Sequence, residues 1–412
     1  FTLALFAKES SALFAGLIPL LIYCFSNKTM VQVVVNSWPF FLLTLLFVLI
    51  RISISAVPDN SEGITFDPYY FASGQEKIAT IALVFGKYFL LMVYPATLIF
   101  DYGYNHIPYV GFSDAKVLLS LVFHLFLAFI SIRMCIKRQI AGFLLLTYLA
   151  GVLLMSNLFL KLGPIMAERF LFTPGFFLIA GLITGIASLI QRVTSRNPNQ
   201  LFGVLLLVCI PFAYSKVLAR NAEWKNNATL YQADLHKAPN SFRVLAFNGM
   251  EKVSSVANLT DTTISNHVYQ EAIRYFNRAF RIYPDYKNMY KEWGYAYLKL
   301  GQLDSAEWAW ARFKILNPSS QYHQINDKLL SEAKFSHCME EYNAHYRDKN
   351  YAYLIGLLSR ALQYKKEDVA TLVNLGKVYY LNHQVDSAKA CWSRALQSDS
   401  TNAEARSLIR LF

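Results

Sequence analysis

The chain changes character within one stretch, VLLLVCIPFAYSKVLARNAEWKNNATLYQADLHKAPN (residues 204–240). The first part of this stretch is almost entirely apolar, and the second part is rich in Lys, Asp, Glu and Asn. Residues 1–217 carry 14 Lys or Arg and 8 Asp or Glu, whereas residues 218–412 carry 25 and 19. Charge density therefore more than doubles here, which predicts a membrane domain over 1–217 and a water-soluble domain over 218–412.

The first half contains several segments that are apolar enough to cross a bilayer, which takes roughly 20 residues as a helix. The candidate segments are about 10–25, 36–54, 78–100, 115–136, 140–160, 170–190 and 200–217. Basic residues follow two of them: Arg133, Lys137 and Arg138 in one loop, and Arg192 and Arg196 in another. The positive-inside tendency then predicts that both loops are cytoplasmic and that the loop at 161–169 and the whole second half are extracytoplasmic.

Segment 78–100 allows two interpretations, because it contains Lys87 and Pro95. A spanning helix would have to neutralise or pair the lysine inside the bilayer, whereas a re-entrant or surface-lying helix avoids part of that cost. We favour the second interpretation, which makes residues 55–114 one extracytoplasmic loop assembly.

The second half has the 34-residue period of tetratricopeptide repeats, which are pairs of antiparallel helices. Residues 287–320 place Gly294, Tyr297, Gly301, Ala306, Trp310 and Pro318 at that repeat's usual positions. Residues 369–402 fit again, 242–285 fit with an insertion near 253–266, and 335–368 form a degenerate repeat. The predicted fold class is therefore all-α, a polytopic helical membrane domain followed by a tetratricopeptide-repeat α-solenoid.

The repeats predict a concave surface that binds a peptide or protein, and a rigid spacer or dimerisation element is the alternative. Their basic residues are interspersed with acids and form no stripe with interleaved aromatics, so we expect no nucleic-acid partner. The five cysteines show no CxxC or Cys/His spacing, so we expect no metal site.

Charged residues in or beside apolar segments are costly and are therefore candidate site residues. The set comprises Lys8, Glu9, Arg51, Asp59, Lys87, Asp101, His106, Glu168 and Arg169. Simpler explanations are helix-end charge pairs for Lys8-Glu9 and Glu168-Arg169, and a helix cap for Asp101. His124, on an apolar helix, is expected to be a packed neutral histidine.

One chemistry unites these residues. A lipid-phosphate donor needs Arg or Lys at the membrane surface to neutralise its phosphate. Glycosyl transfer also needs a carboxylate that takes the proton of the acceptor hydroxyl.

Four stretches carry a family resemblance. They are Ala7-Lys8-Glu9-Ser10, the region from Arg51 through Asp59-Asn60 to KYFLLMVYPATLIFDYGYNHIP (87–108), MAERFLFTPGFFLI (166–179) and RNAEWKNNATLYQADLHKAPN (220–240). In this order they resemble the transmembrane and tetratricopeptide-repeat O-mannosyltransferases, which are multi-spanning glycosyltransferases of the GT-C architecture.

The resemblance implies transfer of mannose from a polyprenyl- or dolichyl-phosphate carrier to Ser/Thr hydroxyls of extracytoplasmic protein. It implies a multi-pass protein of the bacterial inner membrane or endoplasmic reticulum membrane, partnered by membrane lipid, the lipid-linked donor and an acceptor bound by the repeats, with no firm cofactor. The family's acidic catalytic motif lies in the first extracytoplasmic loop, which we expect upstream of Phe1. The catalytic base is therefore unknown, and this N-terminally truncated fragment is expected to be inactive alone.

Two alternatives stay open. An O-antigen ligase or polymerase also joins many spans to extracytoplasmic repeats, and it would use a glycolipid acceptor. A membrane-anchored scaffold without catalytic activity would use only the repeats.

Overall fold

The computed structural model describes residues 1–54, 60–159, 161–193 and 198–411, and for residues 9, 10, 54, 60–62 and 198–201 it describes the backbone only. These described residues form eighteen α-helices and no β-strand, which confirms the all-α prediction. They divide into two compact units: unit 1 is Phe1–Asn248 with Arg278–Pro284, and unit 2 is Gly249–Asn277 with Asp285–Phe412. The predicted boundary at 217/218 separates lipid-exposed from water-exposed sequence, which is a different property from compactness. It therefore stays a prediction.

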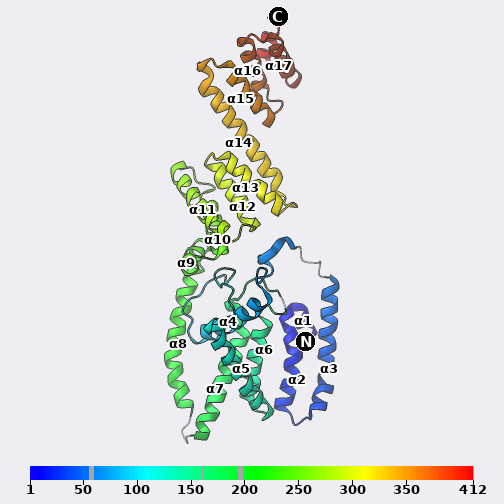
Figure 1. The fold of residues 1–412 in the computed structure, drawn as a ribbon, viewed down its shortest axis with the longest axis vertical. Helices are drawn as coiled ribbons and strands as arrows, with labels where there is room; N and C mark the ends of the chain where they lie inside the picture. The colour runs from blue at the N-terminus through cyan, green and yellow to red at the C-terminus, as the bar shows by residue number, and fades with distance from the viewer. Residues whose placement is uncertain (55–59, 160, 194–197, 412) are drawn as a thin grey trace. The chain divides into compact units, whose positions relative to one another are not determined.

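Unit 1 contains the apolar helices (Figure 1). They are α1 (Thr2–Ala7), α2 (Leu13–Phe25), α3 (Met30–Ile54), α4 (Gly74–Val93), α5 (Ala115–Ile136), α6 (Ile140–Leu154), α7 (Phe172–Val193) and α8 (Pro198–Glu223), followed by the polar α9 (Asn227–Lys237). Helix α10 (Phe242–Val256) begins in unit 1 and ends in unit 2, and α11 (Thr262–Ile282) does the reverse.

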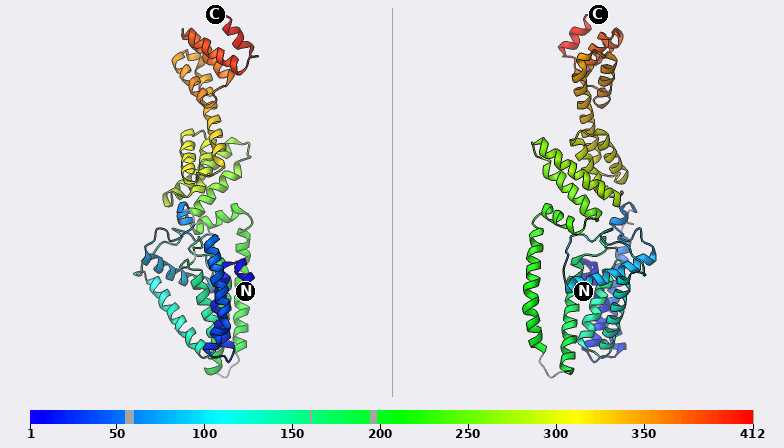
Figure 2. Two further views of the ribbon diagram at one scale, coloured as in Figure 1. Left: turned by 90° about the vertical axis from the view of Figure 1, so that its right-hand side faces the viewer. Right: turned by 60° about the vertical axis from the view of Figure 1, so that its left-hand side comes forward.

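Four helical segments in the described part of the chain are long and apolar enough to cross a membrane. They are Met30–Ser53, Ala115–Ile136, Glu168–Val193 and Phe202–Glu223, while α2 and α6 are apolar but shorter. Large apolar side chains on them face outward, such as Leu119 and Leu207, which are 73% and 76% exposed. Figure 2 shows α8 beside α5–α7 rather than between them. Apolar exposure on this scale supports membrane association.

Small residues allow the helices of unit 1 to pack closely. A side chain at Gly142 would meet the backbone of α5, one at Gly181 would meet Leu145, and one at Gly151 would meet Pro174. Close helix–helix packing at glycine is the usual way in which membrane helices associate. The α5–α6–α7 bundle is therefore tightly held along its length.

Helix α4 lies against one end of this bundle. It begins with a capping box between Ser73 and Glu76 and ends at Val93, two residues before Pro95, because a proline disfavours helical backbone in the residue before it. Gly86 lies against Ser120 near the start of α5, and the Tyr88 hydroxyl accepts a hydrogen bond from the Ala167 N–H at 3.1 Å, just before α7. The helix is thus shorter than the predicted segment 78–100. These contacts suit a surface-lying helix. That residues 55–114 are extracytoplasmic stays a prediction.

Unit 2 is built of helical hairpins. Its further helices are α12 (Lys287–Lys299), α13 (Leu303–Leu316), α14 (Tyr322–His345), α15 (Tyr351–Tyr364), α16 (Val369–Leu381), α17 (Val385–Ser398) and α18 (Ala403–Ile409). Helix α14 starts well before residue 335, where the degenerate repeat was expected. The expected insertion near 253–266 is mostly helical, because α10 runs to Val256 and α11 starts at Thr262.

One contact recurs between paired helices of unit 2. Gly294 of α12 faces the Trp310 indole of α13, and Gly376 of α16 faces the Trp392 indole of α17. Each indole N–H donates to a carbonyl of the partner helix, Lys291 at 3.0 Å and Val373 at 3.3 Å. The spacing of glycine and tryptophan in the sequence therefore fixes how closely the two helices approach.

We expect the Gly294→Ala substitution to destabilise unit 2, because the added methyl group would overlap the Trp310 indole. Overpacking of this kind costs about 1–3 kcal/mol. Gly356→Ala in α15 is the matched control, since nothing lies within 4 Å of its new methyl group and alanine favours helix. Thermal unfolding of both variants in detergent measures the difference, and equal midpoints would contradict the packing argument.

Candidate functional site

The candidate site is organised around the loop between α4 and α5, residues 94–110. Ile99, Tyr102 and Ile107 of this loop are buried and pack against Tyr88 and Tyr148 from the helices. The loop is irregular, so its backbone N–H groups need partners other than a helix. Three described side chains outside the loop accept from them: Glu168 from Ile99, Asp234 from Phe100 and Thr80 from Val110.

Glu168 at the start of α7 holds the middle of the loop. Its carboxylate accepts hydrogen bonds from the Ile99 N–H at 2.9 Å and from the Tyr102 hydroxyl at 2.8 Å. The backbone of Tyr102 also forms a bridge with Met166. Burial and the nearby charge of Glu168 raise the pKa of Tyr102, so its hydroxyl keeps its proton and donates at neutral pH.

Asp234 of α9 holds the next loop residue. Its carboxylate is fully buried, accepts a hydrogen bond from the Phe100 N–H at 2.6 Å and pairs with Arg220 of α8 at 2.8 Å. Glu223 contacts both Arg220 and Lys237, and Lys237 donates to the Leu98 carbonyl at 3.2 Å. These four charged residues tie the end of α8 and α9 to the loop.

Arg243 at the start of α10 completes the arrangement. It pairs with Asp101 at 3.0 Å and donates to the Thr65 carbonyl at 3.1 Å. The second oxygen of Asp101 lies 2.7 Å from the position that a Cβ at residue 103 would take, so only glycine fits there. We call Glu168, Arg220, Asp234, Lys237 and Arg243 the loop clamp.

Each carboxylate whose side chain is described in unit 1 is already engaged in a hydrogen bond or ion pair. They are Asp67, Glu76, Asp101, Asp114, Glu168, Glu223 and Asp234. A general base must be able to accept a proton from its substrate. Among them, Asp101 pairs with Arg243 through one oxygen, while its second oxygen is buried and has no hydrogen-bond partner.

Two cations beside the loop have no ion-pair partner among the described residues. Lys87 and Arg169 are exposed and form no ion pair with a described residue, and the Arg169 guanidinium lies over the Phe170 ring. The hydrogen bond between Tyr88 and Ala167 holds α4 next to the segment that leads into α7. His106 is half-buried, and burial followed by the charge of Lys87 lowers its pKa, so it is neutral at neutral pH.

The structure thus gathers five of the predicted site residues around one loop, namely Lys87, Asp101, His106, Glu168 and Arg169. Of the others, Lys8 is exposed after α1, and Arg51 is exposed in the last turn of α3. The side chain of Glu9 and the whole of Asp59 lie outside the described residues.

Two of the simpler explanations are corrected. Asp101 caps no helix, because α4 already ends at Val93 and the carboxylate pairs with Arg243. Glu168 and Arg169 form no charge pair with each other, because Glu168 turns toward the loop while Arg169 stacks on Phe170. His124 is packed as predicted: it is buried, and its Nδ1 lies 2.8 Å from the Ser120 carbonyl.

Sequence reasoning missed Arg220, Asp234, Lys237 and Arg243 as functional residues. Asp234 did leave a signal, because it follows Leu230 by four residues and so shares the buried face of α9. A carboxylate on a buried helix face needs a partner. The sequence around Asp234, however, does not indicate which loop residue donates a hydrogen bond to it.

Comparison with known proteins found relatives of one kind. The chain is 24% identical over 241 residues to Protein O-mannosyl-transferase Tmtc3 of Drosophila melanogaster, which is 56% of this chain and 24% of that protein. It is 25% identical over 304 residues to TMTC3 of Mus musculus (70% and 30%) and 30% identical over 173 residues to F38B6.6 of Caenorhabditis elegans (39% and 24%), both also named protein O-mannosyl-transferases. The chain thus spans only about a quarter to a third of these curated relatives. No family model matches it.

We expect Asp234→Asn to destabilise unit 1 by about 3 kcal/mol, because breaking a buried ion pair leaves Arg220 without its main partner. Asp114→Asn is the control: it makes the same chemical change in the same unit, but at a helix N-cap, where asparagine serves as well as aspartate. Thermal midpoints in detergent compare them. Similar midpoints would show that the clamp carries little stability.

Proposed function

We propose that this chain is part of a membrane glycosyltransferase that moves mannose from a polyprenyl- or dolichyl-phosphate carrier to Ser/Thr hydroxyls of protein. The observation that carries the proposal is the similarity to proteins named protein O-mannosyl-transferases from fly, mouse and worm. Within it, unit 1 supplies a GT-C-type membrane domain, and the helical hairpins of unit 2 are tetratricopeptide repeats.

Arg169 is our first candidate for binding the donor phosphate. It is exposed, and the neighbouring Glu168 is turned away into the loop clamp, so no adjacent carboxylate neutralises it. A phosphate oxygen would supply a charge-assisted hydrogen bond. Lys87 of α4 is the second candidate, for the same reasons of exposure and lack of a described ion pair.

The surface below Arg169 suits a prenyl chain. Arg169 lies in the 3₁₀ turn Glu168–Leu171 that leads into α7, and Phe172 and Phe176, four residues apart, share one face of the start of α7. The two phenylalanines are 88% and 66% exposed. A lipid whose phosphate binds Arg169 can therefore lay its apolar chain along α7 while it stays in the bilayer.

Each described carboxylate of unit 1 already makes a contact of the fold through at least one oxygen, so we assign the proton-accepting step to none of them. Asp101 and Glu168 act in the proposal as positioning residues that hold the loop beside the cations. We further propose that the repeats lie on the extracytoplasmic side of the bacterial inner membrane or the endoplasmic reticulum membrane and bind the acceptor. Arg133 and Arg192 in the last turns of α5 and α7, and Lys137 directly after α5, support this orientation.

The direct test supplies the full-length protein in proteoliposomes with labelled polyprenyl-phosphate-mannose and a Ser/Thr-rich peptide. We expect label on the peptide. Label on a glycolipid acceptor instead would favour a ligase or polymerase, and no transfer to either acceptor would favour a scaffold.

We expect Arg169→Gln to raise the KM for the lipid-linked donor by about tenfold or more, because a charge-assisted hydrogen bond contributes about 1.5–3 kcal/mol. Membrane insertion should not change. Lys116→Gln, an exposed cation in the first turn of α5, removes the same charge and should leave the KM unaltered. Wild-type kinetics for Arg169→Gln would mean that this residue does not bind the donor.

A further inference from the structure

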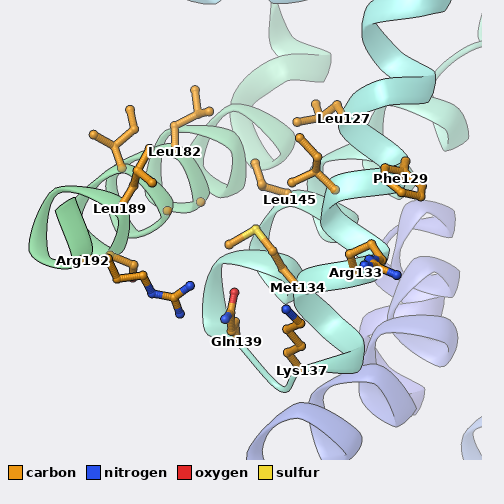
Figure 3. Close-up of a pocket in the computed structure, with 15 residues that line it drawn as sticks. Leu127, Phe129, Arg133, Met134, Lys137, Gln139, Leu145, Leu182, Leu189 and Arg192 are labelled. Atoms are coloured by element: carbon orange, nitrogen blue, oxygen red, sulfur yellow. The ribbon is translucent and has the colours of Figure 1, made fainter.

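A cavity lies at the other end of the α5–α7 bundle from the loop clamp. Its volume is about 590 Å³, and it is lined by α5, the α5–α6 turn and α7 (Figure 3). Its walls are mainly apolar, with Leu127, Leu145, Leu182 and Leu189 among the lining residues. Gly181 and Gly185 of α7 also line it.

Three cations line the same cavity at one end. Figure 3 shows Lys137 and Gln139 from the α5–α6 turn and Arg192 from α7 on its polar side, with Arg133 of α5 nearby. Arg133, Lys137 and Arg192 are exposed and form no ion pair with a described residue. Arg138, in the same turn, differs: its guanidinium donates to the carbonyls of Ser26 and Lys28 at 2.7 and 3.1 Å and is therefore structural.

The sequence supplies no counter-charge to these cations from the helices around them. No Asp or Glu occurs between Asp114 and Glu168 or between Glu168 and Glu223, and these three acids lie at the ends of α5, α7 and α8 remote from the cavity. The loop-clamp end of unit 1 pairs its acids with bases, whereas this end has bases alone. The described acids of these helices therefore leave the three cations open to a charge-assisted hydrogen bond from an external anion.

We propose that this cavity binds one anionic glycerophospholipid of the bilayer, with its phosphate among Arg133, Lys137 and Arg192 and an acyl chain against the apolar walls. A free phosphate would leave the apolar walls unused. A soluble peptide would not reach between lipid-facing helices, where Phe129 and Leu189 are 60% and 61% exposed. Basic pockets between membrane helices favour anionic headgroups for this reason. The inference does not rest on the proposed transferase activity.

The test is native mass spectrometry of the full chain, released from vesicles of equimolar phosphatidylcholine and phosphatidylglycerol. We expect one retained phosphatidylglycerol per chain. The triple variant Arg133→Gln/Lys137→Gln/Arg192→Gln should bind it roughly a hundredfold more weakly, because each surface cation contributes about fivefold. The control Lys77→Gln/Lys116→Gln/Lys225→Gln removes the same charge from half-buried Lys77 and exposed Lys116 and Lys225 elsewhere in unit 1, and should retain the lipid.

A second pair of variants probes the apolar part without altering charge. A Cβ at residue 185 would lie 3.8 Å from Ala141 and 3.9 Å from Met134, which is ordinary van der Waals contact, so alanine fits there without a clash. We expect Gly185→Leu to displace the acyl chain and lower retention, while Gly185→Ala retains the lipid. Equal retention by the triple variant and its control, or preference for phosphatidylcholine, would each overturn the proposal.

Discussion

The fold of unit 1 depends on satisfying the backbone of one irregular loop that lies against membrane helices. Two successive N–H groups, those of Ile99 and Phe100, donate to carboxylates from two distant elements, Glu168 and Asp234. Because an unsatisfied buried N–H is costly, these carboxylates are required for structure. Asp234 in turn needs Arg220, since a lone buried charge is unstable. Acids at this end therefore hold the loop, and the cations beside it, such as Arg169, remain available to an incoming anion.

The two ends of the α5–α7 bundle differ in how their charged residues are paired. At the loop clamp, the acids and bases come from several elements and neutralise one another. At the other end, Arg133, Lys137 and Arg192 have no acid on the neighbouring helices, so their neutralisation has to come from the surroundings. The net charge of the whole chain does not reveal this difference, because it depends on where the acids and bases lie along the sequence.

Periodic features of the fold could be predicted from sequence, and long-range pairs could not. Apolar length located α5 and α7, and the glycine–tryptophan spacing located the α12–α13 and α16–α17 hairpins, because both signals are local. The end of α4 was placed too late, although Pro95 marks it. The candidate residues around the loop were found by their polarity. Their partners were missed, because Asp101 and Arg243 are 142 residues apart and no periodicity links them.

The loop clamp has a consequence for biosynthesis. Residues 94–110 emerge from the ribosome long before Asp234, Lys237 and Arg243, whose contacts with the loop span 134 to 142 residues of chain. The loop therefore cannot reach its final shape while the membrane helices are being inserted. Completion of this surface waits for α9 and the start of α10, so a nascent chain stopped before residue 243 would carry its helices without a finished loop.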